Sequence, residues 1–387
     1  MIVAQCKVTV EPDAAPATDS PTDVPVTTPS SERLVSLDAL RGYTMFWILG
    51  ADSFFTSLSR FGDTGWTAAL AAQFQHVRWA GLRFYDLIFP MFVFIVGVSI
   101  VFSLDRIVQR AGRAAAHVRV LRRFALIFLL GVFYDGGIAY AREENLLCGV
   151  LQRVALCYLL AALLYLNLRL RGLVVTCVTI LVGYWALMSF VPVPGEPAAS
   201  FARDHNWSDY IDRLAPPYHH RDPEGLLSTL PASCSALLGV FAGLLMKARG
   251  IDDRRKVRAL MVGGLVLAAA GLLWSLQYSL IKRVWTSSYV LVAGGHSAVM
   301  LSIFYTVIDR WKMRKWATPL IWIGMNPITL YMAVNVADMG ALARRLVGGD
   351  IESAVGPSGE MLVSAVAMAM VLLLARSLYE RRVFIRL

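Results

Sequence analysis

One histidine stands where side-chain chemistry at a membrane surface is feasible. His76 lies beside Arg78 and Trp79, a few residues before a long apolar segment. A neutral imidazole is available near neutral pH, and it can act as a base or as a nucleophile. The alternative for His76 taken alone is an interfacial histidine without a catalytic role.

Ionisable residues inside the apolar segments form the second group of candidates. Each costs about 2.5–3.5 kcal/mol to insert and needs a partner or a function. Asp38 and Arg41 are three residues apart, so they are expected to neutralise each other. Arg153 follows Gln152 with no acidic residue within one turn, which predicts a distant carboxylate or a phosphate as its partner. Asp86 opens a segment, where a helix cap is the alternative to a functional role.

The chain that carries these residues is strongly apolar. Of its 387 residues, 57% are apolar and 17% are charged, against about 45–50% and about 25% in soluble domains. The apolar residues gather in windows of about 20, the length of a membrane-spanning helix. This pattern excludes a soluble enzyme, a fibrous protein and a disordered chain. It predicts an all-α, polytopic integral membrane protein with about ten transmembrane helices in one bundle.

Ten spans are predicted, each from one apolar window. They are 34–55, 84–104, 120–140, 146–166, 171–191, 226–247, 257–279, 289–308, 316–337 and 359–378. Before them, the run from Glu11 to Ser31 is rich in Pro, Thr, Ser and Asp. Such a segment cannot bury enough surface to fold. The predicted organisation is a disordered cytoplasmic tail over 1–32 and one transmembrane domain over 33–387.

The distribution of positive charge predicts an orientation. If the N-terminus is cytoplasmic, the inside segments hold roughly twice as many Lys and Arg residues as the outside segments. Both termini are therefore expected in the cytoplasm, with the protein in the inner (plasma) membrane. This bias accounts for much of the net charge of +10 without nucleic acid as a partner. Two long loops, 56–83 and 192–225, then lie outside and carry His76 and Glu224.

Three other sequence features concern a helix break, helix packing and metal binding. Asn326-Pro327 is expected to break the ninth span, and a broken helix must line a cavity or pack on protein. Gly239 and Gly243 form a GxxxG pattern, which favours close helix packing. The neighbouring histidines of the second outer loop have no third imidazole nearby, so no metal site is predicted.

Five sequence blocks, in this order, resemble one known family. They are Ser36-Leu37-Asp38-Ala39-Leu40-Arg41-Gly42, then His76-Val77-Arg78-Trp79-Ala80-Gly81 with Asp86-Leu87-Ile88-Phe89-Pro90, then Gly149-Val150-Leu151-Gln152-Arg153, then Asp222-Pro223-Glu224-Gly225-Leu226-Leu227, then Gly324-Met325-Asn326-Pro327. The chain is similar to the heparan-α-glucosaminide N-acetyltransferase family and its bacterial relatives of the NagX type. Any one block is weak, but five in family order across the membrane part are specific.

The resemblance implies a transmembrane acetyltransferase. Acetyl-CoA from the cytoplasm would donate to the amine of a glucosamine-type sugar on the outer face. The family's essential histidine falls on His76. Its second catalytic residue, an asparagine, falls on Asp52, where this sequence departs from the family. An ionised aspartate there is able to orient His76 but cannot donate a hydrogen bond to an oxyanion.

Further roles follow as hypotheses from the resemblance. Arg122, Arg123 and Arg153 are the candidates for holding the phosphates and nucleotide of acetyl-CoA. Gln152 would position the thioester, and Asn326 would donate to the tetrahedral oxyanion. Asp86 and Glu224 are the candidates for binding the acceptor. His76 would either deprotonate the acceptor amine or take the acetyl group itself, and a homodimer is implied.

Two other functions stay open at this stage. A secondary transporter of a sugar or other small solute is compatible with ten spans, an intramembrane Arg153 and a broken ninth helix. No repeat relates the two halves of the sequence, which argues against it. An O-acyltransferase of an envelope glycan would need the same membrane architecture, and no residue distinguishes an amine from a hydroxyl acceptor.

Overall fold

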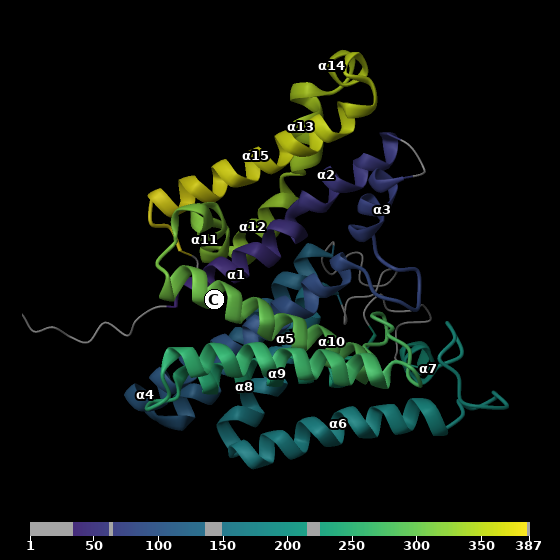
Figure 1. Ribbon diagram of the computed structural model, residues 1–387, viewed down its shortest axis with the longest axis vertical. Coiled ribbons are helices and arrows are strands. Elements are labelled where there is room, and N and C mark those ends of the chain that lie inside the picture. The colour runs from purple at the N-terminus through teal and green to yellow at the C-terminus, as the bar shows by residue number, and fades with distance from the viewer. Residues whose placement is uncertain (1–33, 62–64, 136–148, 215–224, 385–387) are drawn as a thin grey trace, which may run out of the picture. The chain divides into compact units, whose positions relative to one another are not determined.

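The computed structural model describes residues 34–61, 65–135, 149–214 and 225–384. Within these residues the regular structure is helical, and the β contact found is an isolated bridge between Ala80 and Ile281. The prediction of an all-α fold is therefore confirmed (Figure 1). The predicted tail, 1–32, and Glu224 lie outside the described residues.

The long helices account for most of the predicted spans. They are α4 (Ile88–Tyr134), α5 (Val150–Asn167), α6 (Leu170–Phe190), α8 (Thr229–Lys247), α9 (Asp253–Trp274), α10 (Ser287–Phe304) and α15 (Gly359–Glu380). The shorter helices are α1 (Val35–Phe46), α2 (Asp52–Thr56), α3 (Trp66–Gln73), α7 (Trp207–Leu214), α11 (Thr318–Met325), α12 (Pro327–Val336), α13 (Met339–Val347) and α14 (Asp350–Ala354). Short π or 3-10 segments are η1 (Trp47–Ala51), η2 (Ser57–Phe61), η3 (Phe84–Leu87), η4 (Tyr305–Arg310), η5 (Lys315–Ala317) and η6 (Gly356–Ser358).

The described residues contain seven helices long and apolar enough to cross a membrane, or eight if one bent pair counts as a span. This agrees with a polytopic membrane protein, and two sources account for the difference between ten predicted spans and eight. The described parts of the predicted spans 84–104 and 120–140 lie largely in α4, which turns at Gly112. The predicted span 34–55 is divided among short segments around Gly50, so no single helix there is long enough. Both glycines have positive φ, 81° and 119°, a conformation that costs other residues more.

The two halves of α4 run back along each other. Phe92 and Val96 from the first half line one cavity together with Ile127 and Arg123 from the second half. A straight helix would hold Phe92 and Ile127 about 50 Å apart, so the two halves must fold back on each other at Gly112. The turn at Gly112 thus brings two predicted spans to the same cavity.

The ninth span is broken where the sequence predicts it. Helices α11 and α12 meet at Asn326 with a bend of 71°. The Asn326 side chain is 1% exposed and donates a hydrogen bond to the Val383 carbonyl at 2.9 Å. The break is therefore stabilised by protein contacts, as an interrupted helix at membrane depth requires.

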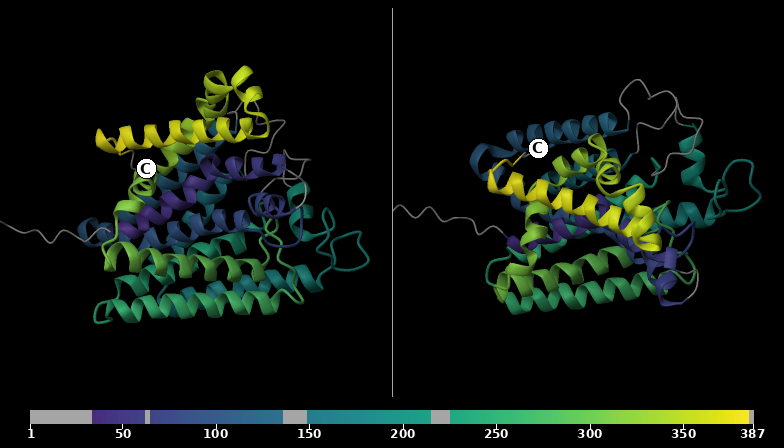
Figure 2. Two further views of the ribbon diagram at one scale, coloured as in Figure 1. Left: turned by 45° about the horizontal axis from the view of Figure 1, so that its top comes forward. Right: turned by 90° about the horizontal axis from the view of Figure 1, so that it is seen from above.

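Small residues bring the central helices into backbone contact. A Cβ built on Gly97 of α4 would overlap the Ala236 carbonyl of α8, and one on Gly239 would overlap the Phe94 carbonyl. The predicted packing role of the Gly239 pattern is thereby confirmed. Helices α8, α9 and α10 lie side by side in Figures 1 and 2, with α9 packed along α10.

This packing makes a prediction about stability. We expect Gly97→Ala to lower the free energy of unfolding by about 1–3 kcal/mol, because the added methyl group forces α4 and α8 apart. Gly183→Ala is the matched control, since nothing lies within 4 Å of a Cβ at Gly183. Unfolding of both variants in detergent provides the measurement. Equal stability of the two variants would contradict the close α4–α8 contact.

Candidate active site

The His76 side chain is hydrogen-bonded to a buried carboxylate. Its Nδ1 atom lies 2.8 Å from Oδ1 of Asp86, which is 1% exposed, whereas His76 itself is half exposed. The second carboxylate oxygen accepts from the Arg83 amide at 3.1 Å, which caps η3. The hydroxyl of Tyr289 on α10 donates to the Asp86 carbonyl at 2.6 Å. The sequence alternatives for Asp86, a cap or a functional group, are thus both compatible with its geometry.

The orientation of His76 follows from this contact. An ionised carboxylate only accepts hydrogen bonds. Nδ1 is therefore the protonated ring nitrogen, and it donates this hydrogen bond to Asp86. A neutral ring then keeps its lone pair on Nε2, the nitrogen that would act as a base or nucleophile. The arrangement is that of a base oriented by a second group.

Tyr85 lies between Asp52 and His76. The hydroxyl of Tyr85 lies near the Asp52 carboxylate, and the Tyr85 ring lies 4.7 Å from the His76 ring, centroid to centroid. The turn of the backbone at Gly50 precedes Asp52 and sets the direction of α2. The two residues predicted to be catalytic are therefore close, with Tyr85 between them.

Lys282 is a member of this cluster that sequence reasoning missed. Its Nζ atom lies 3.0 Å from Nδ1 and 3.3 Å from Nε2 of His76, and 3.6 Å from Oδ1 of Asp86. In the sequence, Lys282 stands out only as one of the positive charges between two predicted spans. No local motif marks it, because it is 206 positions away from His76 along the chain.

Three adjoining cavities connect this cluster to a second polar region. The His76 cavity, about 130 Å³, is lined by Ile48, His76, Tyr85, Ile88, Phe89, Val150, Lys282 and Tyr331. The apolar neck, about 20 Å³, is lined by Met45, Ile48, Phe89, Phe92, Val150, Leu151, Val154, Pro327, Ile328 and Tyr331. The arginine cavity, about 210 Å³, is lined by Arg41, Phe92, Val96, Ser99, Arg123, Ile127, Leu151, Val154, Tyr158, Met325, Pro327 and Ile328.

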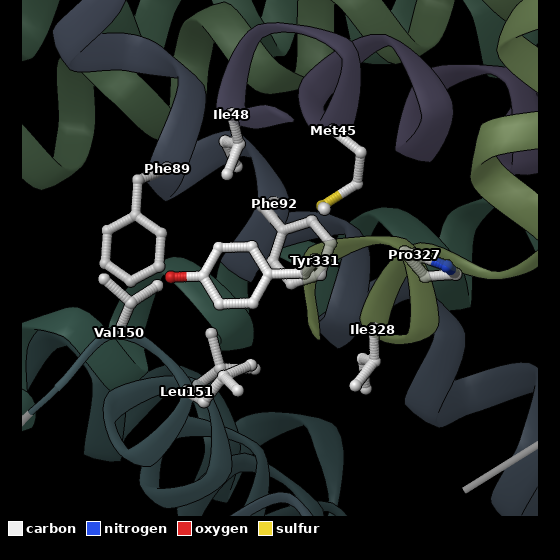
Figure 3. A pocket seen from close by; sticks show the side chains of 10 residues that line it. Met45, Ile48, Phe89, Phe92, Val150, Leu151, Pro327, Ile328 and Tyr331 are labelled. Atoms are coloured by element: carbon white, nitrogen blue, oxygen red, sulfur yellow. The ribbon is translucent and has the colours of Figure 1, made fainter. Parts of the chain in front are cut away.

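Shared side chains make the three cavities neighbours. The His76 cavity and the apolar neck have Phe89 and Tyr331 in common, and the neck shares Phe92 and Ile328 with the arginine cavity. In Figure 3 the Tyr331 ring reaches across the neck, and its hydroxyl points toward Phe89 and Val150. From Phe89 to Ser99, α4 rises about 15 Å. A small apolar cavity therefore lies between two wider cavities that carry polar side chains.

Two arginines line the arginine cavity. Arg41 pairs with Asp38 at 3.3 Å, as the sequence predicts, and donates to the Ser99 hydroxyl at 2.9 Å. The guanidinium of Arg123 lies over the Tyr158 ring, 4.7 Å from its centroid. Arg122, predicted beside Arg123 as a ligand of the donor, is exposed.

The remaining predicted ligands lie outside these linings. Gln152 is buried and donates to the Asp135 carboxylate at 2.7 Å. Arg153 is fully buried and donates to the Gly225 carbonyl at 2.7 Å and to the Ser228 hydroxyl at 2.5 Å. Its guanidinium also lies 5.4 Å from the centre of the Trp285 ring. Arg153 thus ties α5 to the start of α8, and the structure brings neither it nor Gln152 or Asn326 into the lining of the three cavities.

In the part of the chain that the structure describes, no group of three or more His, Cys, Asp and Glu side chains is arranged to hold a metal ion. The absence of a metal stays a prediction, since the outer loop around Glu224 lies outside the described residues.

The position of Arg153 predicts a stabilising role. We expect Arg153→Met to lower the free energy of unfolding by about 1–3 kcal/mol, because Gly225 and Ser228 lose buried hydrogen bonds. Arg122→Met is the control, and as an exposed substitution it should change stability by no more than about 0.5 kcal/mol. Denaturation in detergent tests both variants. A wild-type unfolding curve for Arg153→Met would contradict the structural role.

Comparison with known proteins completes the description of the site. Residues 33–270 match the family of the heparan-alpha-glucosaminide N-acetyltransferase catalytic region. The chain is 29% identical to the Homo sapiens heparan-alpha-glucosaminide N-acetyltransferase over 328 residues, which is 68% of this chain and 49% of the human protein. It is 26% identical to the Mus musculus protein of the same name over 373 residues, 80% of this chain and 56% of the mouse protein. The chain thus spans about half the length of the curated relatives it matches. The match covers more than half of this sequence, includes His76, Asp86 and the lining of the arginine cavity from α4 and α5, and shows that the chain belongs to the heparan-alpha-glucosaminide N-acetyltransferase family.

Proposed function

We propose that this protein is a transmembrane N-acetyltransferase. It moves the acetyl group of cytoplasmic acetyl-CoA to the amine of a glucosamine-type sugar on the outer face of the membrane. The observation that carries the proposal is the row of neighbouring cavities, with the apolar neck between the arginine cavity and the His76 cavity. The acceptor class comes from the names of the human and mouse relatives.

The arginine cavity is suited to the donor's charged end. Acetyl-CoA carries phosphates on a nucleotide, and guanidinium groups bind phosphates strongly. Arg41 and Arg123 line this cavity, and Arg122, which directly precedes Arg123 and is exposed, would supply a further contact. The apolar neck matches the slender pantetheine arm, which would present the thioester in the His76 cavity.

At the thioester, His76 has two chemically balanced routes. As a base, Nε2 removes a proton from the acceptor's ammonium group. The freed amine attacks the thioester carbonyl and the C–S bond breaks. The amide nitrogen then gives its second proton to the coenzyme thiolate, and the imidazolium releases its proton to solvent. As a nucleophile, Nε2 attacks the carbonyl, forms an acetyl-imidazole and releases the thiolate. The acceptor, as the neutral amine, then displaces the imidazole, its nitrogen gives a proton to the coenzyme thiolate, and the histidine is regenerated. Asp86 orients the ring in both routes.

Water exclusion supports transfer over hydrolysis. The neck is narrow and lined by apolar side chains, apart from the hydroxyl of Tyr331. When the donor fills it, water from the arginine cavity has no path to the thioester. The bound donor is then the link between the arginine cavity and the His76 cavity.

The orientation and assembly belong to the same proposal. The excess of Lys and Arg in alternate loops supports cytoplasmic termini, with the His76 cavity at the outer face of the inner (plasma) membrane. A homodimer is the assembly that the family suggests, with acetyl-CoA, the amino sugar and the bilayer as the partners.

Substitution of His76 tests the proposal. We expect His76→Ala to reduce release of CoA in the presence of glucosamine by at least about 100-fold, the typical contribution of a base. Binding of acetyl-CoA, measured by calorimetry on purified protein, should change little because the arginine cavity is intact. His205→Ala is the matched control, since His205 pairs with Glu196 on an outer loop and should keep wild-type turnover.

Two results would contradict the proposal. If folded wild-type protein binds no acetyl-CoA, the acetyltransferase function is wrong and a solute transporter becomes the better hypothesis. If His76→Ala turns over glucosamine at the wild-type rate, the role of His76 is wrong. Turnover with a sugar hydroxyl but not with the amine would favour an O-acyltransferase instead.

A further inference from the structure

The contact between Lys282 and His76 joins distant parts of the chain in a fixed geometry. Lys282 lies between α9 and α10, and its side chain is 18% exposed. The segment that follows His76 pairs with the segment that precedes Lys282, through the bridge between Ala80 and Ile281. The amide of Gly81 donates to the Leu280 carbonyl at 2.8 Å within this pairing.

Hydrogen bonds within the segment 281–286 fix the backbone on the other side of Lys282. The Ile281 amide donates to the Thr286 hydroxyl at 3.1 Å, and the Trp285 amide donates to the Lys282 carbonyl at 3.0 Å. Ile281 and Trp285 are buried. Because both flanks of Lys282 are fixed, its Nζ atom is delivered to His76 by the fold and not by a freely moving surface loop.

The charges at His76 oppose each other. Among the described residues, those with ionisable groups facing the ring are Asp86 and Tyr85 from η3, Asp52 from α2, and Lys282. A carboxylate at hydrogen-bond distance favours the imidazolium form of a histidine, since opposite charges stabilise each other. The ammonium group of Lys282 has the reverse effect, and it lies close to both ring nitrogens.

The hydrogen bond to Asp86 determines which ring nitrogen of His76 is able to accept from Lys282. Nδ1 carries the proton given to Asp86, so it cannot accept from Lys282. Toward this pair, Lys282 is able to donate a hydrogen bond to Nε2, at 3.3 Å, and to form an ion pair with the Asp86 carboxylate, at 3.6 Å. In either arrangement, a second proton on Nε2 would bring the imidazolium against the ammonium.

We propose that Lys282 is a positioning residue that offsets the charge of Asp86 and keeps His76 in its neutral form. Asp86 can then orient the ring without holding a second proton on it. The flexible lysine stem lets Nζ move from Nε2 to Asp86 when the acceptor amine arrives. The inference rests on the proposed function for its catalytic meaning, but the protonation of His76 is measurable without turnover.

The test is the pH dependence of carbethoxylation of His76. Diethyl pyrocarbonate forms a bond to a neutral imidazole nitrogen, and peptide mass spectrometry resolves His76 from the other five histidines. We expect Lys282→Met to move the midpoint of this reaction to higher pH by about one unit, because loss of the positive charge favours the imidazolium. Lys282→Arg should restore the wild-type midpoint within a few tenths of a unit.

Two further variants complete the design. Arg283→Met removes the neighbouring exposed charge and should leave the midpoint unchanged. Asp86→Asn removes the opposing charge and should move the midpoint to lower pH. Thermal unfolding of each variant identifies any that do not fold.

The outcomes separate this inference from the proposed function. A folded Lys282→Met protein whose midpoint stays at the wild-type value, or moves to lower pH, overturns the role of Lys282. A shifted midpoint in a protein that never acetylates glucosamine supports that role and rejects the function. If both hold, the acidic limb of the turnover profile of Lys282→Met moves to higher pH together with the midpoint.

Discussion

The buried carboxylate of Asp86 is the contact on which the candidate active site depends. One carboxylate oxygen accepts a hydrogen bond from Nδ1 of His76, and the other accepts one from the Arg83 amide. The backbone carbonyl of Asp86 accepts a hydrogen bond from the Tyr289 hydroxyl on α10. A single residue therefore starts η3, fixes the ring of the candidate base and anchors the segment to another span. Burial makes these contacts strong, since water does not compete for the carboxylate. It also creates a charge that needs compensation, and Lys282 is placed to supply it.

The passage and the tight helix contacts are two consequences of one packing pattern. Helices α4 and α8 meet at glycines, so their backbones approach closely. On the other face of α4, Phe89, Phe92 and Val96 meet side chains from α12, α5 and the returning half of α4, and this contact leaves space. The bend at Asn326 allows α12 to line that space while α11 packs on α1. The face of α4 that meets α8 is thus closely packed, while the opposite face of α4 lines the apolar neck and the arginine cavity.

Local patterns in the sequence predict a good part of this structure. Apolar windows located the long helices, Asn326-Pro327 located the break, and the spacing of Asp38 and Arg41 predicted their pairing. The blocks containing His76 and Asp86 identified the family. Contacts between distant segments were not predictable in this way. Lys282 reaches His76 only because Ile281 pairs with Ala80, and Arg153 binds Gly225 and Ser228 because α5 and α8 are neighbours. Positive φ at Gly50 and Gly112 also changed where helices end, since hydropathy carries no information on backbone conformation.

The central claim is that one protein joins a donor on one side of the membrane to an acceptor on the other. Its most direct test uses the purified protein in sealed proteoliposomes, with acetyl-CoA carrying a labelled acetyl group inside and glucosamine outside. The account predicts labelled N-acetylglucosamine in the outer solution while CoA stays inside. Product formation only when acetyl-CoA and glucosamine share a compartment would contradict a path that crosses the membrane through the apolar neck.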